Sequence, residues 1–566
     1  MRYRTLAMLV PLYNGSGSDM MSSKARPGTR GRLPHTLNHW LPRVLAFRNW
    51  SRIYPILSRS AGPGLLVVGI VVLFWPALGV FFVGDDFYWI QHARYDMATL
   101  PGFLWPFAHT NGSGQFRPLT LDLYFWVCWH LFGMDPLGYH LVELLVFIVT
   151  ALVIYRLLAN LTTSLPIAFV GAAIWAFSLT HYEGLNWIDA YAETGAILPA
   201  ALALYALSRG KGRWATFWYV VCLFSNETVS VIPAMATAYL FIWEGPNLSR
   251  TLRRSAPLWI VFALYMAARL FIPAVRPIAA GPFALVVNPM IWLDLIRQSF
   301  LWSLGYMYAF LDVFLYAGVA WHRSAAMIAG IYILSLVLLI LGGIVKMIQI
   351  GRIESKAVRL IVLGVAWFLL GLAPVLPFAR NFAAYNLSLS LIGIAVMIAG
   401  LAVAAGEWSP ALCAFVLISY LGLNLLSFYG PGGLDTTDGV TVFARSAHVA
   451  YTAMSAYEHL HPGPFTVYID DKGASFWVLQ ANSMAYLVAP GSTVCYDESW
   501  CAKANIVFHY DPAHYTITPV VGMSPTTPVL TRYTTGLQRM SQKAPDLQSG
   551  DAWPLRAVFA LDGYWW

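Results

Sequence analysis

Two adjacent carboxylates, Asp85 and Asp86, directly follow the first long apolar segment of the chain, in the sequence Val83-Gly84-Asp85-Asp86. Because neighbouring like charges repel, one of the two carboxyl groups is expected to have a raised pKa unless a cation or a substrate group offsets the repulsion. A carboxyl group with a raised pKa is suited to take a proton as a general base. The alternative is an end-cap, since loops at a membrane surface often begin with acidic and aromatic residues. The sequence does not separate Asp85 from Asp86 in either role.

Arginine side chains are the candidates for binding a phosphate group. A guanidinium group binds phosphate oxygens through two parallel hydrogen bonds, and we expect Arg380 to do so first and Arg117 second. Further ionisable residues recur at the predicted outer ends of apolar segments, where charged groups are costly and usually face a cavity or a partner. We expect these residues to bind substrate or, alternatively, to form ion pairs that only hold helices together: His140, His181, Glu183, Asp189, Glu193 and Glu227.

A metal ion is not required by the sequence, and the cofactor is unknown. A divalent cation that bridges Asp85, Asp86 and a phosphate group is compatible with these residue types, but two carboxylates do not establish such a site. No Cys/His spacing typical of a metal site is present. Cys495 and Cys501 are close enough in the sequence to form a disulfide if this part of the chain is extracytoplasmic.

The composition identifies the environment in which these residues work. Of the 566 residues, 58% are hydrophobic and only 11% are charged, whereas an ordinary soluble domain has about 25% charged residues. The composition therefore indicates a polytopic integral membrane protein and excludes secreted enzymes, nucleic-acid binders and disordered scaffolds. The net charge of +8 does not indicate a nucleic-acid partner, because ten Lys and Arg residues against one acid lie in residues 1–60. We expect this basic segment to stay cytoplasmic and to contact anionic lipid.

The spacing of the apolar segments predicts about eleven transmembrane helices, since a span needs about 20 apolar residues. Basic clusters at 209–213, 250–254 and 346–359 predict cytoplasmic loops. The first outer loop, 84–136, and the tail from 430 are then extracytoplasmic. We interpret 299–320 as interfacial or re-entrant, because a full span there would reverse this arrangement. The predicted spans are 64–83, 137–158, 165–180, 190–208, 214–224, 228–243, 256–273, 325–347, 359–377, 388–405 and 409–429.

The chain divides by composition into three parts. Residues 1–60 form the basic cytoplasmic segment, 61–429 the transmembrane module with its long outer loop, and 430–566 the tail. The outer loop is rich in tryptophan and phenylalanine, which predicts helices that lie in the membrane interface. In the tail, short apolar runs at 465–469, 476–479 and 506–509 are bounded by Gly, Pro and Asp. Such runs are typical of strands, and we expect a small mixed α/β domain there.

Short motifs along 64–405 resemble the GT-C glycosyltransferases, and within them the branch of the protein O-mannosyltransferase-like enzymes. Asn226 stands where that branch usually has lysine, the late motif lacks its glutamate, and no tetratricopeptide repeat follows. The acceptor of that branch can therefore not be assigned to this chain. The motifs are Phe116-Arg117-Pro118-Leu119-Thr120, the segment 132–142, His181-Tyr182-Glu183 with Trp187 and Glu193, Ser225-Asn226-Glu227-Thr228 with Pro233, and 374–377 with Ala379-Arg380 and Tyr385.

This resemblance implies a transferase that uses a polyprenyl-phosphate-linked sugar as donor and inverts the sugar on transfer. It implies that an acid of the first outer loop is the base, by analogy Asp85 as the first of the pair. An apolar groove for the lipid is expected along the aromatic-rich segment 281–324. The expected location is an integral membrane, the plasma membrane in a bacterium, and the acceptor is a protein, lipid or polysaccharide.

Two other functions fit a polytopic membrane protein. The first is a transporter or flippase of a lipid-linked or amphiphilic substrate. Transporters tend to have internal repeats with matching broken helices, whereas here the polar residues gather at one predicted membrane face, which favours the enzyme. The second is a scaffold that displays the tail, which would leave the placement of Asp85, Asp86 and Arg380 without a purpose.

Overall fold

A computed structural model describes parts of Ile56–Trp566 only, and the predicted basic segment 1–60 lies outside the described residues. The described residues are 62–111, 114–275, 285–305, 320–350, 355–406, 409–429, 439–469, 478–480, 482–495, 504–511 and 516–519.

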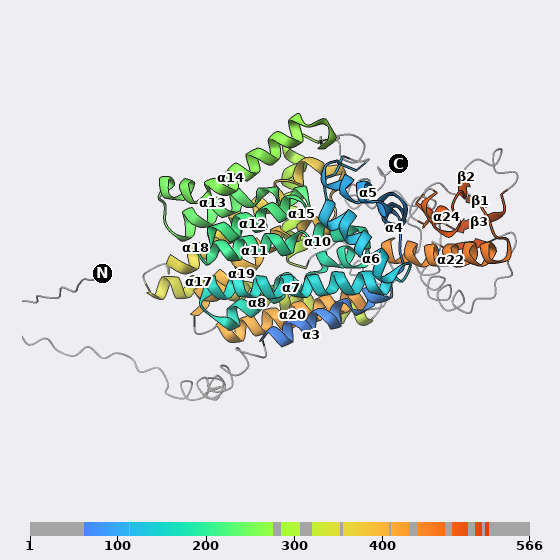
Figure 1. Ribbon diagram of the computed structural model, residues 1–566. Coiled ribbons are helices and arrows are strands. Elements are labelled where there is room, and N and C mark those ends of the chain that lie inside the picture. The colour runs from blue at the N-terminus through green and yellow to red at the C-terminus, as the bar shows by residue number, and fades with distance from the viewer. Residues whose placement is uncertain are drawn as a thin grey trace, which may run out of the picture. The chain divides into compact units, whose positions relative to one another are not determined.

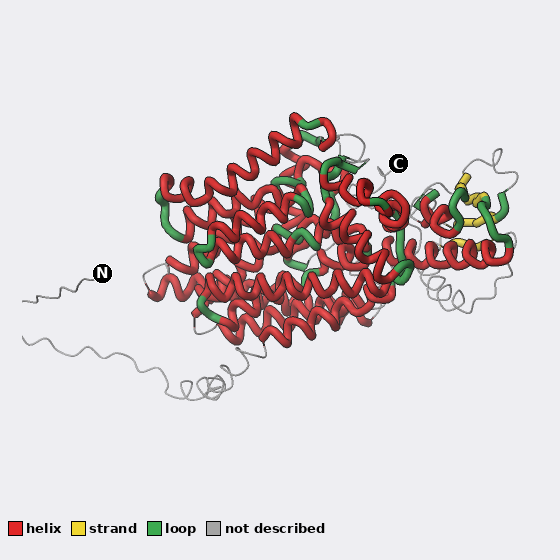
Figure 2. Tube along the Cα trace, viewed as in Figure 1, coloured by secondary structure: helices red, strands yellow, loops and turns green. Residues whose placement is uncertain are grey.

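The described residues are mostly helical, and strands occur only towards the C-terminal end (Figures 1 and 2). A helix occupies each segment in which the sequence predicts a span. These helices are α3 (Gly62–Phe74), α7 (Pro136–Thr162), α8 (Leu165–Ala176), α11 (Ile197–Ser208), α12 (Gly212–Leu223), α13 (Ile232–Trp243), α14 (Leu248–Phe271), α17 (Ala320–Ile350), α18 (Ser355–Leu372), α19 (Ser390–Ala405) and α20 (Ser409–Tyr429).

Three helical stretches among the described residues are long and apolar enough to cross a membrane: Gly62–Gly79, Pro136–Thr162 and Ile188–Ser208. A fourth is reached if Leu165–Ala176 and Leu179–Asn186, which meet at a bend of 46°, count as one span. These stretches support an integral membrane protein. The total of about eleven spans stays a prediction.

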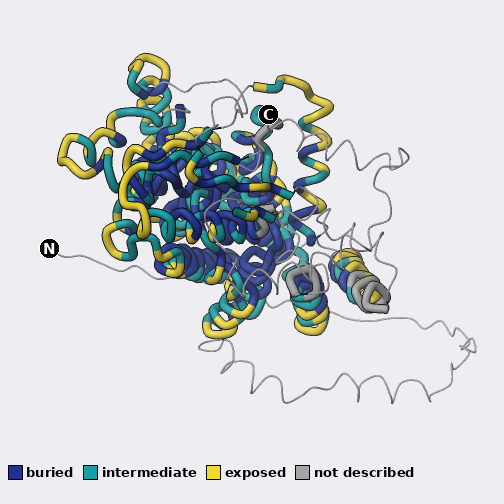
Figure 3. The backbone as a smooth tube through the Cα atoms, turned by 90° about the vertical axis from the view of Figure 1, so that its right-hand side faces the viewer, coloured by how far each residue is buried: buried dark blue, intermediate teal, exposed yellow. Residues whose placement is uncertain are grey.

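Large apolar side chains are exposed on several helices. Figure 3 shows that buried residues gather inside the helical part and exposed ones lie at its edges. On α3 and the turn that follows it, Leu65, Val68, Val72 and Trp75 are each more than half exposed. A contiguous exposed apolar face is unusual on a soluble monomer. In a bilayer the same face contacts lipid, which agrees with the composition.

The helices α18 and α19 approach until their backbones touch, because glycines face each other at the crossing. A Cβ atom on Gly393 would lie 2.3 Å from the backbone nitrogen of Phe368, and one on Gly364 would lie 2.6 Å from the carbonyl oxygen of Gly393. Small residues allow such close packing. In a membrane the hydrophobic effect does not drive helices together, so close van der Waals contact between helices stabilises their association instead.

Further helices connect the predicted spans at the end that carries the first outer loop. They are η6 (Leu179–His181), α9 (Tyr182–Asn186), η7 (Ile188–Ala190), α10 (Tyr191–Thr194), η8 (Glu227–Val231), η9 (Pro273–Val275), α15 (Pro289–Ser303), η11 (Leu376–Asn381) and η12 (Ala384–Leu387). The segment predicted to be interfacial, 299–320, contains the end of α15, and its residues 306–319 lie outside the described residues.

The first outer loop is built from short helices, as the sequence predicts, and not from extended chain. It follows η2 (Trp75–Gly79) and contains α4 (Asp85–Tyr95), η3 (Asp96–Ala98), α5 (Leu100–Leu104), η4 (Trp105–Phe107), η5 (Pro118–Asp122) and α6 (Leu123–Phe132). The loop ends where the side chain of Asp135 accepts a hydrogen bond from the backbone of Leu137 and so caps α7.

The tail contains a four-stranded mixed sheet in the order β2 (Thr493–Cys495), β1 (Thr466–Ile469), β3 (Ile506–Asp511) and β4 (Thr516–Pro519). β1 is parallel to β2 and β3, and β3 is antiparallel to β4. The predicted strand at 476–479 is wrong in its described part, because Val478 and Leu479 are helical and fully buried. The described helices of the tail include α22 (Gly439–Leu460) and α24 (Ser483–Val488).

One hydrophobic cluster joins the tail to the first outer loop. Phe87 and Phe125 of the loop and Val467 and Phe508 of the sheet belong to it. The guanidinium group of Arg94 also donates a 3.0 Å hydrogen bond to the carbonyl oxygen of Leu487. The loop and the tail therefore lie against each other at one end of the helices, as Figure 1 shows for α4 and α24.

Candidate active site

The acidic pair opens α4 because Gly84 turns the chain immediately before it. Gly84 has φ 55° and ψ −124°, a conformation that residues with a Cβ atom rarely adopt. Asp85 and Asp86 then occupy the first turn of α4, where the unpaired N–H groups of a helix favour negative charge. The sequence Gly-Asp-Asp thus fixes where the two carboxylates begin, and their surroundings differ from there on.

Asp86 is fully buried and uses both carboxylate oxygens inside the protein. Its Oδ2 accepts a 2.9 Å hydrogen bond from the backbone N–H of Val83, and its Oδ1 accepts a 2.7 Å bond from the backbone N–H of Asp189. Burial raises the pKa of Asp86 well above its ordinary value, while the two N–H donors oppose that shift. Asp86 ties the start of α4 to η7 and has no free oxygen for a substrate.

Asp85 is partly exposed and accepts a hydrogen bond from the side-chain amide of Gln480 in the tail. Burial raises the pKa of Asp85 from 3.8 to about 6, and the hydrogen bond from Gln480 partly opposes this shift. A carboxylate with a pKa near the working pH is an effective general base. The geometry therefore separates the two acids, which the sequence leaves together.

Arg117 is held between two carboxylates. Its Nη2 lies 3.0 Å from Glu193 Oε1, and its Nε lies 3.1 Å from Glu227 Oε2. Burial would lower the pKa of Arg117, but the two carboxylates outweigh burial and raise it. The guanidinium group is permanently charged and largely compensated, so it is less available for a phosphate group than the sequence suggests.

Asn226 links the two elements that carry Glu193 and Glu227. A lysine is usual at this position in the family that the motifs resemble. Its Nδ2 donates a 3.0 Å hydrogen bond to the carbonyl oxygen of Ala192 in α10, and its Oδ1 accepts a 2.8 Å bond from the backbone N–H of Thr228. The fully buried amide thereby holds Glu193 beside Glu227.

Arg269, near the end of α14, joins this cluster although the sequence analysis does not select it. Its Nη2 donates to the carbonyl oxygen of Gly114 at 3.1 Å and to Glu227 Oε1 at 3.3 Å. Its Nη1 is buried and has no hydrogen-bond partner within the described residues. A lone arginine inside a predicted apolar span was the available signal, because a charge there is costly unless it serves a site.

Asp189, Glu183 and Tyr385 complete the cluster. The carboxylate of Asp189 interacts electrostatically with Asp85 and Arg117. Burial raises the pKa of Tyr385 well above its ordinary value, and Glu183, Glu193 and Asp189 raise it further. The structure thus brings together Asp85, Arg117, Glu183, Asp189, Glu193 and Glu227 from the predicted set, with Arg269 and Tyr385 added.

His140 lies apart from this cluster and forms hydrogen bonds within the surrounding framework. Its Nδ1 is 3.0 Å from Glu143 Oε2, and its Nε2 is 3.2 Å from the carbonyl oxygen of Val80. Glu143 also accepts a 3.2 Å hydrogen bond from the hydroxyl of Tyr124. This buried chain fixes the segment that leads into α4, and Glu143 is a further residue that the sequence analysis does not select.

His181 is buried in the helical core. Its Nε2 lies 2.9 Å from the carbonyl oxygen of Trp175, and its Nδ1 lies 3.3 Å from the hydroxyl of Ser388. The rings of Phe147 and Trp175 pack against it. These contacts leave neither ring nitrogen open to a substrate.

The backbone of Arg380 lies in η11, and its side chain is outside the described residues. Cys495 is disulfide-bonded, and Cys501, its predicted partner, is outside the described residues as well. Within the described part of the chain, no group of three or more His, Cys, Asp or Glu side chains converges on a metal position.

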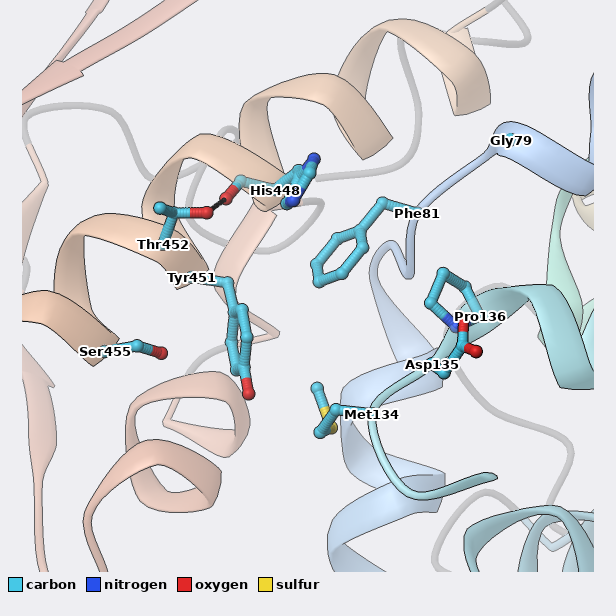
Figure 4. Close-up of a pocket in the computed structure, with 9 residues that line it drawn as sticks. All are labelled: Gly79, Phe81, Met134, Asp135, Pro136, His448, Tyr451, Thr452 and Ser455. Carbon is cyan, nitrogen blue, oxygen red and sulfur yellow. Dashed lines mark hydrogen bonds between the residues drawn. The ribbon is translucent and has the colours of Figure 1, made fainter. Parts of the chain in front are cut away.

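A cavity of about 510 Å³ lies between α22, the segment around Phe81 that precedes α4, and the end of the first outer loop around Met134 (Figure 4). Phe81 stacks on His448 with ring centroids 4.5 Å apart, and Tyr451 follows His448 along the same face of α22. None of the residues that line the cavity belongs to the predicted site. They are Gly79, Phe81, Met134, Asp135, Pro136, His448, Tyr451, Thr452 and Ser455.

No protein-family model and no curated protein matches the chain. Among solved structures, the chain is similar to ArnT from Cupriavidus metallidurans in the apo state, with 14% identity over 80% of this chain and 94% of that chain and a TM-score of 0.33. It is also similar to ArnT from the same organism bound to undecaprenyl phosphate, with 13% identity over 79% and 92% and a TM-score of 0.30. Similarity at this level identifies no family for the chain.

Proposed function

We propose that the protein is an integral membrane glycosyltransferase that moves a sugar from a polyprenyl-phosphate donor to an extracytoplasmic acceptor with inversion of the sugar. The observation that carries the proposal is Asp85: a partly exposed carboxylate with a pKa of about 6, next to the buried Asp86 and interacting with Asp189, whose carboxylate in turn interacts with Arg117. The GT-C motifs that run through 64–405 support the same reaction.

Asp85 acts as the general base in this proposal. Its carboxylate takes the proton of an acceptor hydroxyl while the acceptor oxygen forms a bond to the anomeric carbon of the sugar. The bond between that carbon and the phosphate oxygen breaks, and its electron pair leaves with the polyprenyl phosphate. Attack opposite to the leaving group inverts the anomeric carbon, and the products are the glycosylated acceptor, polyprenyl phosphate and a protonated Asp85.

The leaving phosphate requires a cation, because negative charge builds up on it as the bond breaks. Arg269 is the first choice, since its Nη1 is buried without a partner among the described residues. Arg117 is compensated by Glu193 and Glu227 and orients those carboxylates instead. Arg380 remains a candidate for the phosphate, on the strength of the sequence motif around it.

The remaining acids are candidates for binding the hydroxyl groups of a sugar. Glu227 is more exposed than its neighbours, with 27% of its side chain accessible, while Glu193 and Arg117 are nearly buried. Carboxylates only accept hydrogen bonds when ionised, which suits the many hydroxyl donors of a saccharide. We assign Glu183, Glu193 and Glu227 to the sugar and its surroundings, and His140 and His181 to structural support.

The test is a donor panel. Purified protein in nanodiscs is incubated with polyprenyl-phosphate sugars that differ in the sugar, and release of free polyprenyl phosphate is measured by mass spectrometry. We expect one donor to be consumed when an acceptor extract is added, and Asp85→Asn to abolish this consumption. Consumption of no donor, or equal consumption by the Asp85→Asn variant, would contradict the proposed function.

A further inference from the structure

The backbone of Gln480 adopts an unusual conformation at the point where the tail meets the outer loop. Its φ is 45°, in the left-handed region that non-glycine residues rarely occupy. The other described non-glycine residue with positive φ is Thr163, which ends α7 as an ordinary left-handed helix cap. Non-glycine residues held in such conformations cluster at binding and catalytic sites.

The surroundings hold Gln480 in this position. The residues before it, Val478 and Leu479, are fully buried in the cluster shared by the tail and the outer loop. On its other side, the backbone carbonyl of Gln480 accepts a 3.0 Å hydrogen bond from Ser483 at the start of α24. The helix α24 in turn receives the hydrogen bond of Arg94 through Leu487. The side chain is therefore presented by a packed framework.

The two ends of the Gln480 amide have different partners. Its Nε2 donates a hydrogen bond to Oδ1 of Asp85. An ionised carboxylate only accepts hydrogen bonds, so the nitrogen must face Asp85 and the oxygen must point elsewhere. That oxygen, Oε1, is buried and has no hydrogen-bond partner within the described residues. A buried acceptor without a partner is costly, and a bound ligand that supplies a donor would remove the cost.

We propose that Gln480 is a positioning residue of the Asp85 site: its Nε2–H holds the Asp85 carboxylate toward the acceptor hydroxyl, and its Oε1 accepts a hydrogen bond from a second hydroxyl group of the bound saccharide. The tail thereby completes the site that the outer loop begins. The inference rests on the proposed function, because the saccharide hydroxyl belongs to the donor or the acceptor of that reaction.

The charged and titratable groups around Asp85 make the contribution of Gln480 measurable. Asp189 faces Asp85 from η7, Tyr88 faces it from α4, and Asp86 lies beside it in the same turn. All three are acidic or neutral, so none of them stabilises the ionised form of Asp85 as Gln480 does. Loss of the Gln480 donor should raise the pKa of Asp85 above about 6, in keeping with the direction in which this hydrogen bond acts.

The experiment compares two nearly isosteric variants with a matched control in the tail. Gln480→Met removes both the donor and the acceptor, whereas Gln480→Glu removes the donor and keeps an acceptor. Thr452→Val is the control, because Thr452 is exposed on α22 and its hydroxyl donates to the carbonyl oxygen of His448 in its own helix. The measurements are kcat/KM against pH, KM for donor and acceptor separately, and the infrared carboxyl band of Asp85 against pH, with Asp85→Asn identifying the band.

Both Gln480 variants should lose about 10- to 100-fold in kcat/KM at pH 6.5, the range expected for a lost hydrogen bond to a charged group. The acidic limb of the pH profile and the midpoint of the Asp85 band should both move to higher pH, and Thr452→Val should change neither. Gln480→Met alone should raise one KM: the donor KM if the hydroxyl belongs to the donor sugar, and the acceptor KM if it belongs to the acceptor.

The inference would be overturned if the wild type is active and both variants keep the acidic limb of the kcat/KM profile and the midpoint of the Asp85 band unchanged. So would a loss of rate that follows a loss of folded protein with the acidic limb in place, because that result indicates a merely structural role. A wild type that consumes no donor overturns the proposed function and the hydroxyl contact with it. The midpoint of the Asp85 band then still decides whether Gln480 holds Asp85.

Discussion

The carboxylate of Asp86 accepts a 2.7 Å hydrogen bond from the backbone N–H of Asp189, which joins the start of α4 to η7 across 103 residues of sequence. The same carboxylate accepts the backbone N–H of Val83. Asp86 is thereby fixed in the framework, whereas its neighbour Asp85 is partly exposed and interacts with the carboxylate of Asp189. Two adjacent acids of identical chemistry thus receive different roles from their surroundings.

Asp85→Asn should lose transfer and gain stability. Removing a general base typically costs about 10²–10⁴-fold in rate. The folded-state pKa of Asp85 is raised from 3.8 to about 6, so its contribution to stability is present below pH 3.8 and is lost as pH rises through about 6. At pH 7.5 the neutral amide of the Asp85→Asn variant avoids this loss, worth up to about 3 kcal/mol. Turnover, donor affinity and Tm at pH 7.5 and pH 4 are the measurements, with equal Tm values expected at pH 4.

Asp86→Asn should behave in the opposite way. An asparagine amide offers one accepting oxygen and one donating nitrogen, so either Val83 N–H or Asp189 N–H loses its partner. A buried donor without a partner costs about 1–3 kcal/mol, and the folded fraction that survives should retain transfer. Thermal unfolding and turnover per folded molecule check this. A stable Asp86→Asn variant without activity would exchange the roles of the two acids.

The sequence predicts the helices at the span positions, the helical outer loop and two of the three expected strands. These elements are predictable because apolar runs and turn residues are local signals. The third predicted strand is wrong in its described part, since the apolar pair Val478-Leu479 is equally compatible with a buried helical turn. The contact between Gln480 and Asp85 could not be predicted, because it depends on packing between segments 395 residues apart. The separation of Asp85 from Asp86 depends on the same kind of information.

Lysine replacements should distinguish the two arginines of the cluster. Arg269→Lys should lower turnover by about 10-fold or more, because a single ammonium cannot keep the bonds to Gly114 and Glu227 while it reaches a phosphate. Arg117→Lys should mainly lower stability, since it leaves Glu193 or Glu227 without its bonded partner. Donor affinity by binding assay and Tm are measured for both. Normal donor affinity and turnover in Arg269→Lys would contradict a phosphate-binding role of Arg269 and leave Arg117 or Arg380 as the phosphate-binding residue.

The first outer loop and the tail should be reached from the same, extracytoplasmic side. His109 in the loop and Thr452 on α22 are suitable positions for single cysteines, with Lys211 as the expected cytoplasmic control. The native free cysteines Cys128, Cys222 and Cys413 are buried and should label weakly. An impermeant thiol reagent should label the first two positions in intact cells and Lys211→Cys only after lysis. Labelling of just one of the first two would contradict the proposed topology.

A pH-dependent ion pair should stabilise the outer loop through His92. Its Nε2 lies 3.3 Å from Asp122 Oδ1 and its Nδ1 lies 2.8 Å from Asp96 Oδ2. Burial lowers the pKa of His92, but the hydrogen bonds to the two carboxylates outweigh burial, and the folded-state pKa lies above the ordinary 6.5. A raised pKa means that the stabilisation is complete below pH 6.5 and is lost as pH rises through the higher folded-state value.

Replacing His92 with glutamine should therefore lower Tm at pH 5.5 and leave it almost unchanged at pH 8.5. The free energy of unfolding at pH 5.5 should fall by about 1 kcal/mol, because Asp96 is well exposed and only the pair of His92 with Asp122 is largely shielded from water. Asp122→Asn should reproduce most of this effect and Asp96→Asn little of it. Thermal unfolding of the three variants at both pH values measures the difference. A loss in His92→Gln that is equal at pH 5.5 and 8.5 would indicate packing of the neutral ring, and not an ion pair, as the source of the stability.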